Sequence, residues 1–212
     1  NTYGGHDGTT LLERYVDDVS NIWKSLFCIG TGNEAASAGH TSGRIASGRE
    51  ETVQLAVQSR QTSISIQIWK EYTDDIELSI INPSGVRVGP VPEILGPQRF
   101  QIGQTEVLLY YGKPSPYSIS QEIYIDLLPV EDYLTEGIWQ IVLSAGKIVT
   151  GQYEMWLPSD NILNRGTGFL FPKDSTTLTI PSSASRAISV GAYDARTFAY
   201  ADFSGRGFTR LT

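Results

Sequence analysis

The feature that most constrains the fold is a series of short segments between residues 50 and 176 in which apolar and polar residues alternate. A period of two places successive side chains on opposite faces of a strand, so that one face is buried and the other is wet. Turn sequences such as Asn82-Pro83-Ser84-Gly85 separate the segments. The segments are 53–57, 63–69, 76–81, 107–111, 123–127, 137–143 and 151–157. Together they predict an antiparallel β-sandwich, of the jelly-roll type.

A different pattern precedes these strands. Between residues 9 and 27, apolar residues recur at spacings of three and four, which predicts a helix with one apolar face. Thr10 and Glu13 match a capping box at its start. The apolar run 26–30 follows at once and predicts a buried strand, with Cys28 as a small core residue. A helix followed by a buried strand is typical of an α/β sheet with parallel strands.

The residues after the alternating segments return to this second pattern. Residues 187–192 predict a strand, and residues 198–205 predict a strand or loop that ends in a glycine turn. Each flanking piece is too short to bury a core alone. The sequence therefore predicts an α/β domain with a partial parallel sheet, formed by residues 1–48 and 177–212, and an all-β sandwich of residues 49–176 inserted in it.

Charge and composition exclude several classes of function. The net charge of −7 argues against a nucleic-acid surface. No apolar run reaches the roughly 18 residues of a membrane span. Cys28 is the single cysteine, so neither an internal disulfide nor a cysteine-ligated zinc is expected. The two histidines, His6 and His40, leave little room for acid–base chemistry or a histidine-bound metal.

Four short motifs, in order along the chain, resemble those of the subtilisin-like serine proteases. Gly30-Thr31-Gly32-Asn33-Glu34 resembles the family's Ala-Gly-Asn-Glu turn, and Asn1-Thr2-Tyr3-Gly4 resembles its substrate-binding strand. Residues 181–191 resemble the strand after the specificity pocket, and residues 203–207 resemble the family's Phe-Ser-x-x-Gly. The length of the insertion and the sequence His6-Asp7-Gly8-Thr9 are most similar to the spore-germination members, which carry an embedded jelly roll.

The resemblance implies which residues act. Asn33 would be the oxyanion-hole donor, although glycine followed by asparagine by itself indicates only a turn. Six further residues would bind the substrate, as its pairing strand or as a wall of the S1 pocket: Thr2, Tyr3, Gly4, Gly30, Thr31 and Gly32.

The family's catalytic motifs are missing from this sequence. No Asp-Ser/Thr-Gly or His-Gly-Thr-His sequence precedes Asn33, and no Gly-Thr-Ser-Met-Ala follows residue 207. The resemblance therefore implies a central fragment of a serine endopeptidase, which hydrolyses peptide bonds as the parent protein and is inactive alone. Its partners would be a peptide or protein substrate and the remainder of the parent chain, outside the cytoplasm, either secreted or in the spore layers.

Two alternatives remain open. If the catalytic triad of the parent protein is substituted, the chain is part of a pseudoprotease with a binding or regulatory role, for example in spore germination. It is a β-sandwich binding module with flanking α/β segments if the four motifs match by accident. In that case residues 50–176 alone would bind a glycan or a peptide.

Several residues of chemically active types have structural interpretations. His6 beside Asp7 is expected at a loop or pocket edge, and His40 with Ser42 at the pocket floor. Ser204 is expected to be structural rather than nucleophilic.

Two acidic pairs and three tryptophans also have structural interpretations. Asp17-Asp18 and Asp74-Asp75 suggest calcium, but no loop repeats acidic residues at ligand spacing, so no cofactor or metal is expected. Three tryptophans in alternating segments indicate sandwich core more than a sugar-binding face: Trp69, Trp139 and Trp156.

Overall fold

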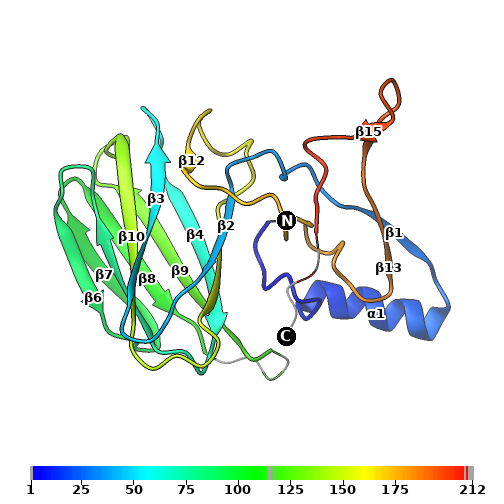
Figure 1. Ribbon diagram of the computed structural model, residues 1–212, viewed down its shortest axis with the longest axis horizontal. Coiled ribbons are helices and arrows are strands. Elements are labelled where there is room, and N and C mark those ends of the chain that lie inside the picture. The colour runs from blue at the N-terminus through cyan, green and yellow to red at the C-terminus, as the bar shows by residue number, and fades with distance from the viewer. Residues whose placement is uncertain (1, 114–115, 117, 208, 210–212) are drawn as a thin grey trace.

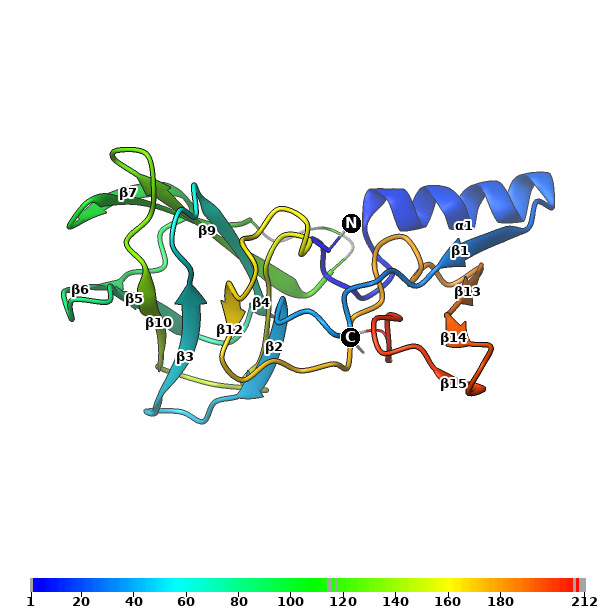
Figure 2. The same cartoon turned by 90° about the horizontal axis from the view of Figure 1, so that it is seen from above.

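The structure is a computed structural model that describes residues 2–113, 116, 118–207 and 209. Asn1, the first residue of the expected substrate strand, lies outside the described residues. Figures 1 and 2 show two stacked sheets on one side and a smaller part with the helix on the other. The elements are α1 (Leu11–Trp23), β1 (Phe27–Gly30), β2 (His40–Arg44), β3 (Glu50–Val57), β4 (Ile64–Glu71), β5 (Ile76–Ile81), β6 (Arg87–Val91), β7 (Gly96–Ile102), β8 (Thr105–Tyr111), β9 (Ser120–Pro129), β10 (Gly137–Ala145), β11 (Gln152–Trp156), β12 (Gly168–Phe169), β13 (Ala187–Val190), β14 (Tyr193–Asp194) and β15 (Ala199–Tyr200).

Two antiparallel sheets contain most of the strands. One has five strands in the order β12-β3-β10-β5-β6, and the other has six in the order β2-β11-β4-β9-β8-β7. Every pair of neighbouring strands in them is antiparallel. The alternating residues of both sheets meet in one apolar core, which includes Leu55, Ile66 and Trp139. Fully burying one leucine or isoleucine side chain contributes about 1.5–3 kcal/mol, so this core holds the two sheets together.

The smaller part is formed by segments from both ends of the chain. β1 and β13 form a parallel pair, with Phe27 opposite Ala187 and Gly30 opposite Val190. The capping box predicted at Thr10 is confirmed. The Thr10 backbone N–H donates to Glu13 Oε2 (3.0 Å), and the Glu13 backbone N–H donates to the Thr10 hydroxyl (3.4 Å). No helix of the described residues is both long enough and apolar enough to cross a membrane.

The predicted α/β subtilisin-like fold is wrong. The described residues contain a single helix, and the strands are antiparallel except for the two-stranded ladder of β1 and β13. The identification with subtilisin-like serine proteases and their spore-germination members implied a parallel α/β core, and the mostly β architecture contradicts it. The reason is that a helix followed by an apolar strand fixes the type of two elements, whereas a parallel core needs several strands side by side.

The same two-stranded ladder explains a second error. Cys28 was expected in a buried strand, but it is exposed in β1. Within the described residues β13 is the one strand that pairs with β1, so alternate residues of β1 are open to solvent.

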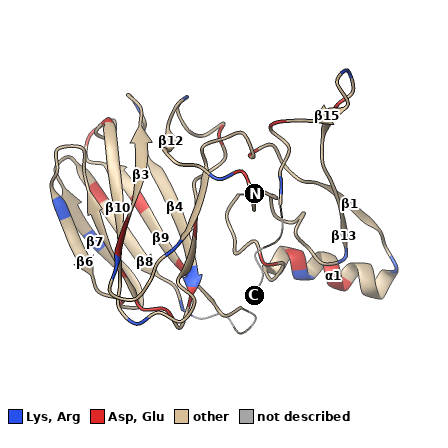
Figure 3. Ribbon diagram, in the orientation of Figure 1, with Lys and Arg blue, Asp and Glu red and all other residues tan. Residues whose placement is uncertain are grey.

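The helix is attached to the molecule by its polar side. Ser183 donates to the Glu13 carboxylate, and the backbone N–H of Arg186 donates to Asp17 Oδ1 (2.7 Å); Figure 3 shows the acidic residues of α1. Large apolar side chains on the rest of α1 are exposed, among them Leu11 and Trp23. An apolar helix face normally covers a core, so this face lacks its cover in the described residues.

Candidate functional site

The candidate site is the turn that follows β1. Gly32 has φ +89°, a conformation that favours glycine. A Cβ at this position would lie 2.3 Å from Thr179 Cγ2, so the close approach of Thr179 also demands glycine. Both the backbone conformation and the packing of Thr179 therefore restrict the turn at Gly32.

Backbone hydrogen bonds hold the turn on both sides of Asn33. They run from Thr179 N to Thr31 O (2.9 Å), from Gly205 N to Gly32 O (3.0 Å) and from Ala35 N to Phe203 O (3.1 Å). The donors and acceptors outside the turn belong to two segments that are more than 140 positions away in the sequence. These segments fix the backbone from which the Asn33 side chain projects.

Ser204 is a packing residue of this turn, as expected. Its side chain is fully buried, its hydroxyl lies 3.2 Å from Thr31 Oγ1, and it accepts from the Ala192 N–H (2.9 Å). It therefore ties the turn to the residues that follow β13.

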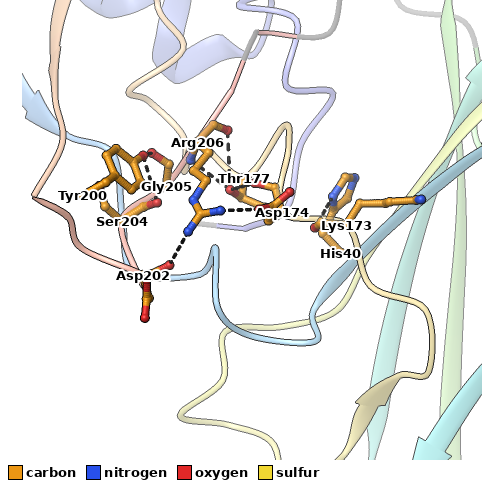
Figure 4. A network of polar contacts seen from close by, with 9 residues as sticks. All are labelled: His40, Lys173, Asp174, Thr177, Tyr200, Asp202, Ser204, Gly205 and Arg206. Carbon is orange, nitrogen blue, oxygen red and sulfur yellow. Dashed lines mark hydrogen bonds and ion pairs between the residues drawn. The ribbon is translucent and has the colours of Figure 1, made fainter.

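A polar network fixes the segment that contains Ser204, and Figure 4 shows it. Arg206 forms an ion pair with Asp174 and also donates to the Asp202 carbonyl (3.3 Å). Its backbone N–H donates to Thr177 Oγ1 (3.0 Å), and its guanidinium carbon lies 5.2 Å from the Tyr200 ring centroid. The segment is thereby clamped onto residues 174–177.

Asn33 itself is exposed at the tip of the turn. Its side-chain amide makes no hydrogen bond within the part of the chain that the structure describes. It lines a cavity of about 390 Å³ together with Ala36, Asp160, Leu170 and Phe203. An unpaired amide on a rigid backbone, beside an open cavity, is suited to donate to an oxygen of a bound molecule.

The expected substrate strand is bound to the sandwich instead of being free. Tyr3 donates its hydroxyl to the Ser65 carbonyl (2.9 Å), and the Gly4 N–H donates to Gln67 Oε1 (2.6 Å). Thr2 is buried and lines a second, smaller cavity.

The three residues expected to form a pocket wall lie in and before the turn. Gly30 ends β1, and a Cβ there would have nothing within 4 Å. Thr31 and Gly32 use their carbonyls to hold the turn in place. The structure thus places four of the seven predicted site residues at the turn: Gly30, Thr31, Gly32 and Asn33. Thr2 lies at the smaller cavity with Glu34, and Tyr3 and Gly4 lie against the sandwich. The roles of all seven stay predictions.

His6 occupies the junction between the N-terminal segment, residue 178 and the sandwich. Its ring nitrogens lie 2.8 Å from the Leu178 and Thr2 carbonyl oxygens, and its ring stacks on Trp156 with centroids 4.2 Å apart. Burial lowers the pKa of His6 below its ordinary value. Trp156 also stacks on His40, at 4.9 Å, so one tryptophan of β11 contacts both histidines.

His40 is likewise engaged in structural contacts. Its Nε2 lies 2.8 Å from Glu154 Oε2, and its Nδ1 lies 3.1 Å from the Lys173 carbonyl. Both histidines line the smaller cavity, next to Glu34. Sequence reasoning placed them at a pocket edge and floor but missed the Trp156 contact, for which the sequence gives no local signal.

Asp17 and Asp74, one residue from each acidic pair considered for calcium, accept hydrogen bonds from the protein itself. The Asp74 carboxylate accepts from the backbone N–H groups of Val149 (2.6 Å), Thr150 (3.1 Å) and Gly151 (2.7 Å). Burial opposes the charge of Asp74, but these hydrogen bonds outweigh it and lower its pKa. Among the described residues, no three His, Cys, Asp or Glu side chains gather so that they could hold a metal ion.

The part of the Asn33 cavity lined by Asp160 and residues 166–170 was missed by sequence reasoning. The sequence predicted these residues only as the end of the sandwich. In the structure they lie beside Asn33, which is more than 120 positions away in the sequence. No spacing or motif marks such a contact.

Comparison with known proteins connects this chain to a protease. The solved structure of the CspB protease of Clostridium perfringens is similar to it, with 31% sequence identity and a TM-score of 0.89 over 98% of this chain. The chain spans 43% of that protein's chain. No protein-family model and no curated protein sequence matches it. At this coarse level, the neighbour is of the class that the motifs predicted, a protease.

Proposed function

We propose that this chain is part of a serine endopeptidase, in which Asn33 stabilises the oxyanion formed at the scissile carbonyl of a peptide substrate. The observation that carries this proposal is the unpaired Asn33 amide, held on a turn whose backbone is fixed on both sides and open to a cavity. The similarity to the CspB protease supports it.

The chemistry follows from the position of the amide. When a serine hydroxyl attacks the peptide carbonyl, the carbonyl oxygen becomes negatively charged, and an amide N–H directed at it stabilises the transition state more than the bound substrate. One such donor typically contributes roughly 3–4 kcal/mol. A fixed turn adds to the effect because its dipole needs no reorientation during the reaction.

The same proposal assigns the substrate-binding residues. Thr2, Tyr3 and Gly4 would pair with an extended substrate, and Gly30, Thr31 and Gly32 would border the residue before the scissile bond. Because the Gly4 N–H already donates to Gln67, pairing at Gly4 would have to replace that bond or use its carbonyl.

The nucleophile and the base would come from the remainder of the parent chain. That remainder would also cover the exposed apolar face of α1 and the open side of β1 and β13, where Ile188 and Val190 are about half exposed. The protein would act without a cofactor, outside the cytoplasm, either secreted or in the spore layers.

A second candidate is a catalytically inactive form of the same protein that binds peptides. The contacts of the two histidines are compatible with it, because His6 lies between the Leu178 and Thr2 carbonyl oxygens and His40 contacts Glu154, so neither is free to act as a base. In that form, the Asn33 turn would bind a peptide carbonyl in its ground state.

The test is the kinetics of the full-length gene product with Asn33→Ala. We expect kcat to fall by about 10²–10³ with little change in KM, since the amide acts mainly in the transition state. Gln104→Ala removes a matched amide from the hairpin between β7 and β8 and should leave both constants unchanged. An unaltered kcat in Asn33→Ala would contradict the assignment, and peptide binding without turnover in the unsubstituted protein would favour the second candidate.

A further inference from the structure

We propose that the cavity beside Asn33 is a peptide-binding subsite, lined in part by Asp160 and residues 166–170, and that it accepts a long basic side chain. This inference rests on the proposed function, because Asn33 would place the cavity next to the scissile bond. The cavity volume of about 390 Å³ lies within the range of about 300–1,000 Å³ typical of ligand pockets.

The cavity has walls from parts of the chain that are distant in sequence. Its lining comes from residues 33 and 36–38, from Ala56 with residues 160 and 166–170, and from Phe203. The sandwich therefore contributes directly to the space at Asn33.

Hydrogen bonds join these walls, so the cavity exists before any ligand binds. The Phe169 N–H donates to the Ala38 carbonyl (2.8 Å), and the Asp160 N–H donates to Glu34 Oε2 (3.3 Å). At Gly168, a Cβ would lie 2.5 Å from the Ala38 Cβ, so the two walls approach as closely as glycine allows. A preformed cavity lowers the entropic cost of binding.

The chemistry of the lining selects the ligand. Leu170 and Phe203 are 42% and 47% exposed and offer apolar surface. Asp160 is the single charged residue of the lining; it is exposed, and no salt bridge engages it within the described part of the chain. Lysine and arginine combine an apolar stem with a cationic head, which matches this arrangement.

The net charge of the chain acts in the same direction. At −7, the chain attracts cationic peptides over a distance, and no lysine or arginine among the cavity's lining residues opposes this attraction. The Glu34 carboxylate, next to the Asp160 backbone, adds a second negative charge near the cavity.

The test compares two peptides on the ¹⁵N-labelled chain by nuclear magnetic resonance. The probes are acetyl-Ala-Ala-Lys-Ala-Ala-amide and the same peptide with norleucine, which keeps the stem and removes the charge. We expect the lysine peptide to shift the signals of the Asn33 side-chain amide and the Gly166 and Gly168 backbone amides. It should bind about three- to tenfold more tightly than the norleucine peptide, a modest factor because Asp160 is exposed.

Two variants assign this preference to Asp160. Asp160→Asn should abolish it, whereas Asp18→Asn, which removes an exposed carboxylate on α1, should preserve it. Raising the ionic strength to about 1 M should also abolish it, because the Debye length falls to about 3 Å. Equal affinity of the two peptides, shifts elsewhere in the chain, or an unchanged preference in Asp160→Asn would overturn the proposal.

The outcomes also separate this inference from the proposed function. If Asn33→Ala lowers kcat of the full-length protein but Asp160→Asn keeps the lysine preference, the subsite is wrong and the oxyanion role stands. If Asp160→Asn abolishes the preference while Asn33→Ala leaves kcat unchanged, the subsite stands as a peptide site and the catalytic role fails.

Discussion

Three glycines allow the rigidity of the Asn33 turn to be measured by matched substitutions. At Gly32, an alanine would meet both a positive φ of +89° and a Cβ contact of 2.3 Å with Thr179. At Gly85, φ is +85° and the space is open, so alanine would meet the backbone strain alone. At Gly30, neither applies, because φ is not positive and nothing lies within 4 Å of the added Cβ.

The expected destabilisation follows from the backbone strain and the steric contact of the added Cβ. A left-handed conformation costs an alanine about 1–2 kcal/mol, so Gly85→Ala should lose this amount. Overpacking adds about 1–3 kcal/mol, so Gly32→Ala should lose about 2–5 kcal/mol in total. Gly30→Ala should stay within about 0.5 kcal/mol of the unsubstituted chain.

The assay is amide hydrogen exchange at Thr179, whose N–H donates to the Thr31 carbonyl beside Gly32. A loss of about 2–5 kcal/mol corresponds to exchange faster by roughly 30- to 4,000-fold where the turn opens locally. Urea denaturation of the same variants gives the effect on global unfolding. If Gly32→Ala exchanged at the rate of Gly30→Ala, the turn would be adaptable and the argument for a fixed Asn33 would be refuted.

Three further predictions concern other parts of the molecule. Burial lowers the pKa of His6, so on acidification the unfolded state binds the proton before the folded state does. The free energy of unfolding should therefore be at its full value above about pH 6.5 and fall as the pH drops below it. Urea midpoints at pH 7.5 and 5.0 would show this fall, which should be smaller in His6→Asn. A fall of equal size in that variant would point to another group. Asp74→Ala leaves the N–H groups of residues 149–151 without an acceptor and should cost about 2–4 kcal/mol in urea denaturation, and a loss below 0.5 kcal/mol would contradict the network. Trp23 is 74% exposed, so Trp23→Ser in this chain should leave the unfolding free energy within about 0.5 kcal/mol and reduce self-association in sedimentation; a large loss would mean that the α1 face is already covered.

Most strands of the sandwich could be predicted because their side chains alternate between core and solvent. The segment 123–127 lies within β9, and 137–143 lies within β10. Four strands of the two sheets were missed: β2, β6, β7 and β12. β2 lies in the segment assigned to the α/β domain, and β12 has two residues. β6 and β7 contain proline and glycine and are largely exposed, β6 at the edge of one sheet and β7 at the edge of the other. Periodicity reports burial, so it is weakest where a strand is least buried.

The α/β core was predicted wrongly for a different reason. The helix and the first strand exist, but the helix is shorter than residues 9–27, at Leu11–Trp23. In the part of the chain that the structure describes, β1 pairs only with β13. Local patterns do not show how many strands assemble. The sequence also does not show that the apolar faces of α1 and β1 are exposed in the described residues.

The candidate site was predictable only where a local motif marks it. The turn at Asn33 was located from its glycines, and Gly32 does have the positive φ and the close approach that such a motif requires. The contact of the turn with Asp160 and residues 166–170 depends on the packing of the sandwich, and no local pattern encodes it.

The central claim is that Asn33 binds an oxyanion, and the affinity of a tetrahedral transition-state analogue tests it most directly. A peptide boronate forms an anionic tetrahedral adduct in a serine protease, whereas an uncleaved peptide of the same sequence keeps a neutral carbonyl. In the full-length gene product, Asn33→Ala should weaken boronate binding by about 10²–10³ and leave the affinity of the uncleaved peptide unchanged. Equal weakening of both, or of neither, would contradict the oxyanion role of Asn33.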